Sequence, residues 1–63
     1  MRVHRITTDE RGSSIIFAKT GVDRFMLEQH RHDADGTVHI SFQEMRRDQA
    51  VELLGAIKEE LGQ

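Results

Sequence analysis

The sequence contains no cysteine, which excludes disulfide bonds as a source of stability. Four histidines without cysteine do not favour a structural zinc site, and we expect neither a metal nor another cofactor. A cysteine-free chain suits a reducing compartment, so the sequence predicts a cytoplasmic protein. A chain of 63 residues buries only about 60% of its unfolded surface, and oligomerisation is the usual remaining support for so small a core.

Long apolar runs are also lacking. No run approaches the roughly 20 residues that a membrane-spanning helix needs, so we expect no membrane contact. The opening segment, MRVHRITTDERG, lacks the apolar core of a signal peptide. Repeats, low-complexity segments and linkers are absent, so residues 1–63 are expected to form a single small domain.

Strong basic charge is missing as well. The net charge is -2: residues 1–32 carry six basic and four acidic side chains, giving +2, and residues 33–63 carry three and seven, giving -4. This asymmetry is much weaker than the basic stripe expected of a duplex-DNA-binding protein. A mildly basic sheet could still bind single-stranded nucleic acid, which is the alternative function. Four residues would carry that alternative: Arg5, Lys19, Arg24 and Arg31.

The segment from Phe25 to Gln43 predicts a β-hairpin. Its centre, Asp33 to Gly36, is a cluster of turn-forming residues, and Asp-Gly is a strong hairpin signal. The apolar side chains of the two limbs are expected on one face of the sheet, with Leu27 on the same side as Ile40. Odd-numbered residues must then face even-numbered ones, which a loop of two or four residues allows and a three-residue loop does not.

The same register predicts a polar outer face. His39 faces His32 if the loop has two residues and His30 if it has four, so three histidines gather on one patch. Three imidazoles can bind one metal ion, but we interpret these histidines as solvated surface residues and predict no metal site. We predict that this face binds a protein partner through six residues: Met26, Glu28, His30, His32, His39 and Ser41.

Two more strands are expected upstream. Residues 1–7 predict a short edge strand, where charged side chains discourage stray pairing. Residues 14–19 (SIIFAK) predict a strand that is apolar on both faces, which indicates either a strand covered twice or one at an interface. If Phe17 faces the core, the loop at Thr20-Gly21 has an odd number of residues and Gly21 takes a positive φ. If Ile16 faces the core instead, a two-residue Thr20-Gly21 loop fits. Both alternatives remain open.

Residues 46–61 predict an amphipathic helix that ends at Gly62. The apolar arc spans roughly 160°, which is wider than the roughly 100° that covering one sheet requires. Gly55 lies inside this helix, where glycine costs about 1 kcal/mol relative to alanine. A close approach of another backbone would explain the glycine, so both features favour a homodimer.

These elements together predict an α+β fold: a four-stranded antiparallel sheet (β-β-β-β-α) with one C-terminal helix packed on one face. The order of elements, and the run from Asp35-Gly36 through Ile40 to Asp48-Gln49, resemble the single-strand-binding domain of transcriptional coactivator proteins, which are homodimers with basic sheets. The chain departs from that family because it lacks the family's dense lysines and arginines and has no tyrosine or tryptophan. The resemblance therefore bears on the alternative function alone.

Signals of catalysis are weak. No serine has an identifiable base and orienting group, and a 63-residue sheet with one helix has little room for a substrate pocket of several hundred Å³. We therefore expect a non-enzymatic binding module. The sequence predicts that it acts through protein–protein contacts, as an accessory, regulatory or inhibitor-type protein, and that it forms a homodimer.

Overall fold

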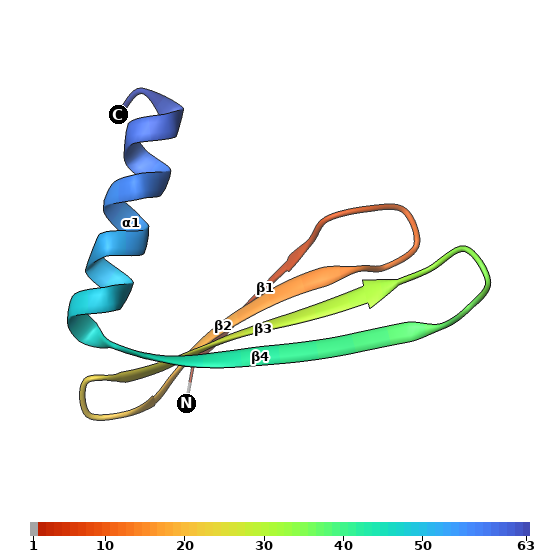
Figure 1. Cartoon of the computed structure of the whole chain (residues 1–63), viewed down its shortest axis with the longest axis horizontal. Coiled ribbons are helices and arrows are strands. Elements are labelled where there is room, and N and C mark those ends of the chain that lie inside the picture. The colour runs from red at the N-terminus through yellow and green to blue at the C-terminus, as the bar shows by residue number, and fades with distance from the viewer. Residues whose placement is uncertain (1) are drawn as a thin grey trace.

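The computed structural model describes residues 2–63 and shows a meander of four strands followed by one helix. The elements are β1 (Val3–Thr7), β2 (Ser14–Gly21), β3 (Arg24–His32), β4 (Val38–Arg46) and α1 (Arg47–Leu61). All three strand pairings are antiparallel, and the order across the sheet is β1-β2-β3-β4 (Figure 1). The predicted α+β fold with β-β-β-β-α order is confirmed. Met1, which the sequence places in the first strand, lies outside the described residues.

The pairing register divides the side chains into two faces, which we name after two residues of β2. The Ile16 face carries the even-numbered side chains of β2 up to Ala18, of β3 and of β4, because Ile16 pairs with Glu28 and Glu28 pairs with Phe42. The Phe17 face carries the odd-numbered ones. In β1 the parity is reversed, since Arg5 pairs with Ile16.

The predicted register of the β3–β4 hairpin is wrong. Arg31 pairs with His39, so odd-numbered residues face odd-numbered ones, and Leu27 and Ile40 lie on opposite faces. The Asp33 N–H donates to the Thr37 carbonyl at 2.9 Å, which leaves a three-residue loop. Gly36 ends that loop with φ at +90°, the geometry of a type I turn followed by a left-handed residue.

This turn chemistry outweighs the matching of apolar side chains. The Gly36 N–H donates to the Asp33 carbonyl at 3.1 Å, and the Asp35 carboxylate accepts from the Thr37 N–H at 2.9 Å. Register follows hydrophobic pattern where one face is buried. Here the chain covers neither face of the hairpin, so the loop decides the register.

The pairing of β2 with β3 follows the first of the two alternatives as far as Lys19: odd-numbered residues face odd-numbered ones, and Phe17 shares a face with Phe25. Phe17 pairs with Leu27 and stacks on Phe25, with ring centroids 5.8 Å apart and planes at 9°. A bulge between Lys19 and Gly21 then shifts the register. Val22 and Asp23 form the actual turn, and Asp23 rather than Gly21 has a positive φ, at 55°.

Helix α1 begins and ends as the sequence predicts. Arg46 is the N-cap, and its N–H donates to the Gln49 side-chain oxygen at 2.9 Å. At the other end Gly62 adopts a left-handed conformation, and its N–H reaches the Glu59 carbonyl at 3.1 Å. These caps satisfy backbone groups that the helix itself leaves open.

The predicted packing of the helix on one face of the sheet is not what the structure shows. None of residues 47–61 is buried, and Figure 1 shows α1 extending away from the sheet. The reason is the missing loop between strand and helix. Arg46 ends β4 in an extended conformation, and the next residue, Arg47, already begins α1. Strand–helix connections that fold a helix back onto its sheet usually need about two to six residues.

Candidate interaction surface

The edge strand β4 carries an exposed apolar row, which we call the strand stripe: Val38, Ile40 and Phe42. Their exposed fractions are 47%, 60% and 67%. All three lie on the Ile16 face, because side chains two apart on a strand share a side. At the centre of the same face Ile16 and Ala18 are buried, at 5% and 2% exposed. The row of β3 separates this small core from the strand stripe, since Glu28 pairs with Ile16 on one side and with Phe42 on the other.

The helix carries a second exposed apolar row, the helix stripe. Its members are Val51, Leu53, Leu54, Ile57 and Leu61. Their exposed fractions run from 36% at Leu53 to 65% at Leu61. An amphipathic helix gains most of its stability by packing such a row against a partner. In the single chain this row has no protein surface against it.

The overall dimensions show the same incompleteness. A folded monomer of 7.3 kDa exposes about 4,200 Å² of accessible surface, whereas this chain exposes 5283 Å². The radius of gyration is 13.3 Å, against about 11 Å for a compact domain of this length. The excess surface, roughly 1,100 Å², is comparable to the roughly 800 Å² that each partner buries in a standard protein interface.

Polar groups gather beside the core on the Ile16 face. His30 Nε2 lies 3.1 Å from Glu28 Oε1, a contact without hydrogen-bond geometry that becomes an ion pair when the imidazole is protonated. Across the ladder, Ser14 pairs with His30, and the Ser14 hydroxyl is buried. Neither Ser14 Oγ nor His30 Nε2 has a hydrogen-bond partner among the described residues. Buried polar atoms of this kind are normally satisfied by a partner or by water.

The six predicted partner-binding residues do not share a face, and the prediction that they do is corrected by the observed register. Four of them lie on the Ile16 face of β3: Met26, Glu28, His30 and His32. His39 and Ser41 lie on the Phe17 face, because His39 pairs with Arg31 and Ser41 with Gln29. That these residues bind a partner stays a prediction, now limited to the four on one face.

His39 belongs instead to a charged cluster at the tip of the β3–β4 hairpin. Its Nε2 lies 2.9 Å from Asp33 Oδ2, and Arg31 Nε lies 3.3 Å from Asp33 Oδ1. One carboxylate thus joins the two strands beside the turn. Within residues 2–63 no group of three or more histidine, cysteine, aspartate or glutamate side chains is placed to hold a metal ion.

The four basic residues of the alternative function are also divided between the faces. Arg5 and Arg24 lie on the Ile16 face, whereas Lys19 and Arg31 lie on the Phe17 face. Arg24 lies 3.7 Å from Glu44 Oε2, which lowers the positive charge at that point. The structure therefore does not bring these four side chains into one basic surface.

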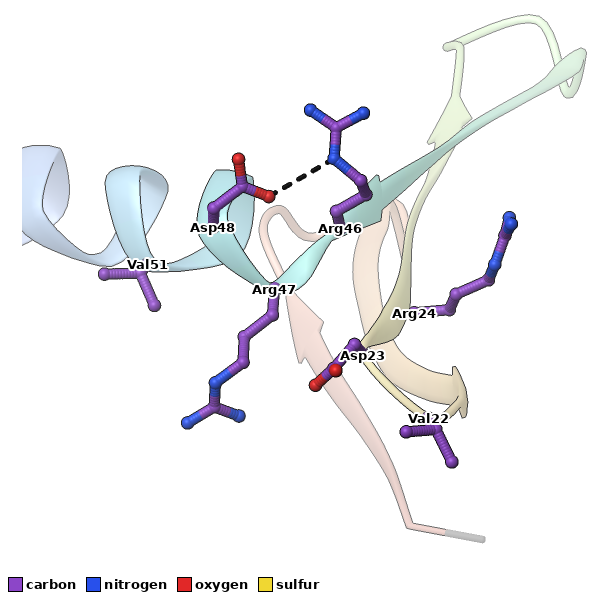
Figure 2. Close-up of a pocket in the computed structure, with 7 residues that line it drawn as sticks. All are labelled: Val22, Asp23, Arg24, Arg46, Arg47, Asp48 and Val51. Atoms are coloured by element: carbon purple, nitrogen blue, oxygen red, sulfur yellow. Dashed lines mark hydrogen bonds and ion pairs between the residues drawn. The ribbon is translucent and has the colours of Figure 1, made fainter.

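An open depression lies where β3, β4 and α1 meet (Figure 2). Its volume is about 850 Å³, and it lies open to solvent. It is lined by Val22, Asp23, Arg24, Arg46, Arg47, Asp48 and Val51. Figure 2 shows Arg46 turned toward Asp48, with its Nε 3.3 Å from Asp48 Oδ1, while Arg47 points the opposite way. The arginines therefore do not converge on one point.

Exposed carboxylates stabilise the turns and the start of the helix. Hydrogen bonding to Ser13, followed by the backbone N–H of Arg11, lowers the pKa of Asp9 below its usual 3.8. Hydrogen bonding to Thr37 lowers the pKa of Asp35 in the same way. The side chain of Arg46 lowers the pKa of Asp48. In each case the hydrogen bonds favour the ionised carboxylate.

Sequence reasoning missed that the strand stripe and the helix stripe are both left uncovered. The sequence does contain a signal that strand and helix are joined without a loop. Residues 41–49 (SFQEMRRDQ) contain no glycine, proline or asparagine, the residues that usually mark a loop. A second signal was the glycine at the third position of the hairpin loop, typical of a three-residue loop.

Comparison with known proteins gives no family assignment. No known protein family, curated protein or solved structure matches this chain. Across residues 2–63, no helix combines the length and the apolar character that crossing a membrane requires.

Proposed function

We propose that this protein is a small non-enzymatic binding module that acts through protein–protein contacts and assembles as a homodimer. In this role it is an accessory, regulatory or inhibitor-type protein of the cytoplasm. The single observation that carries the proposal is the surface excess: 5283 Å² where a folded monomer of this mass exposes about 4,200 Å².

The chemistry of that surface supports the proposal. Both stripes consist of aliphatic or aromatic side chains, and large exposed apolar patches mark sites of protein association. Three polar residues of β3, Glu28, His30 and His32, lie one strand away from the strand stripe, in the same row as Met26. An apolar row beside a polar row is the usual composition of a protein interface.

The test is the mass of the protein in solution. Sedimentation equilibrium at micromolar concentration and neutral pH should give the mass of two chains. A mass of one chain, together with a cooperative melting transition, would show that the lone chain is stable and would refute the homodimer.

The alternative is binding of single-stranded nucleic acid through Arg5, Lys19, Arg24 and Arg31. The resemblance to coactivator single-strand-binding domains in element order favours it, and the division of these residues between two faces weighs against it. A titration with single-stranded DNA at increasing salt separates the two functions. A steep fall in affinity with salt supports the alternative, and no binding at low salt removes it.

A further inference from the structure

We propose that the two copies exchange helices: α1 of each copy packs its helix stripe over the strand stripe on the Ile16 face of the other. This inference rests on the proposed homodimer and adds which surfaces meet. The occupant of the exposed apolar surfaces is therefore a second copy of this chain.

The first reason is the β4–α1 junction. Strand β4 ends at Arg46 and α1 begins at Arg47 without a connecting loop, so the helix continues outward from the end of its own strand. Figure 1 shows the result, with α1 standing clear of β1 to β4. Short connections that block the intramolecular contact are a common cause of exchange between identical chains.

The second reason is the fit between the two stripes. The strand stripe is about 13 Å long and the helix stripe is about 15 Å long, so one can lie along the other. Neither stripe contains a charged residue, and the flanking carboxylate of Glu28, which pairs across the ladder with Phe42, lies 3.1 Å from His30 Nε2. The three exposed large apolar side chains of β4 form one row on the Ile16 face, whereas the exposed large apolar strand residue on the Phe17 face is Ile6, on the opposite edge strand β1, which favours the Ile16 face.

The third reason is symmetry and area. A twofold axis makes the contact twice, because α1 of each copy covers β4 of the other. Both stripes of both chains are then removed from water together. The excess of roughly 1,100 Å² per chain is enough for a standard interface, in which each partner buries roughly 800 Å².

Disulfide crosslinking between two different variants tests the arrangement, and the absence of native cysteine makes the experiment clean. Ile40→Cys and an affinity-tagged Ile57→Cys are purified separately, mixed, and oxidised under mild conditions. The matched control replaces Ile40→Cys with Ser41→Cys, the next residue of β4, whose side chain points to the Phe17 face. We expect roughly tenfold more mixed disulfide from the first pair, because bridging requires nearby and correctly directed Cβ atoms.

Each outcome decides a different point. A two-chain mass with the Ile40 product dominant supports helix exchange over the Ile16 face. A two-chain mass with the Ser41 product dominant, or with neither product, overturns the exchange and leaves the homodimer standing. A one-chain mass for the unmodified protein overturns both.

Discussion

At the scale of single residues, Gly36 determines more of the structure than any apolar residue does. Its φ of +90° closes the three-residue loop of the hairpin, and the loop sets which side chains of β3 and β4 share a face. Alternation of the sequence defined each strand's two faces correctly. Alternation does not determine which face of β3 lies beside which face of β4, because both strands carry apolar residues and the chain covers neither strand.

Replacing Gly36 and Gly55 with alanine should have opposite effects. Gly36→Ala should lower the free energy of unfolding by about 1 kcal/mol, because a side chain disfavours the left-handed backbone. Gly55→Ala should raise it by about the same amount, since an added Cβ there meets nothing within 4 Å in the chain. Urea unfolding monitored by circular dichroism measures both. A loss of stability in Gly55→Ala would contradict the second expectation and indicate a backbone close to the helix in the dimer.

Asp9 should make the protein less stable in acid. Its pKa is lowered in the folded state by hydrogen bonding to Ser13, so its contribution is fully present above the unfolded pKa of about 4 and is lost as the pH falls through the folded pKa. The melting temperature of the unmodified protein should therefore exceed that of Asp9→Asn at pH 6, and the difference should shrink toward pH 2. Glu10→Gln controls for the loss of one negative charge. A difference that stays constant over this range would contradict the assignment.

At the scale of elements, the existence and order of the strands and the helix could be predicted from the sequence. Strand β2 is rich in β-branched and aromatic residues, and α1 has an apolar period and a terminal glycine, so each is specified locally. The placement of α1 was predicted wrongly, because it depends on the length of one junction, and the strand and helix patterns were read separately. Because the helix begins at the residue that follows the strand, the chain has no loop in which it could reverse direction.

Lengthening that junction should change the assembly. Inserting about five Gly and Ser residues between Arg46 and Arg47 should let α1 fold back over its own sheet and yield a monomer, since flexible connections of this length allow the reversal. Sedimentation should then give the mass of one chain. The matched control inserts the same residues between Ala34 and Asp35 at the hairpin tip, where the mass of two chains should persist. A dimer in both variants would show that the junction does not direct the exchange.

At the scale of the whole molecule, the single chain buries a small apolar core. Only Ile16 and Ala18 are buried among the apolar residues that the structure describes. Side chains that would normally enlarge the core, such as Phe42 and Ile57, are 67% and 48% exposed. In the proposed homodimer, the surfaces between chains would supply the missing burial, as they do in obligate homodimers.

The melting temperature should consequently rise with protein concentration. Unfolding of a dimer releases two chains, so mass action shifts the transition upward as the concentration increases from micromolar to millimolar. Scanning calorimetry at several concentrations measures the shift. Ile57→Glu should lower the melting temperature, because a charge in the helix stripe would be buried unpaired at the interface, whereas Glu52→Gln should have little effect. A transition that does not depend on concentration would contradict the obligate dimer.

The absence of any residue between β4 and α1 also has a kinetic consequence. In the proposed helix exchange, each sheet forms within one chain, but the step that shields its apolar edge needs a collision with another molecule. Refolding should thus contain a second-order phase whose half-time halves when the amount of chain is doubled. In a cell, the rate of synthesis would then govern how long newly made copies stay exposed to aggregation and proteolysis.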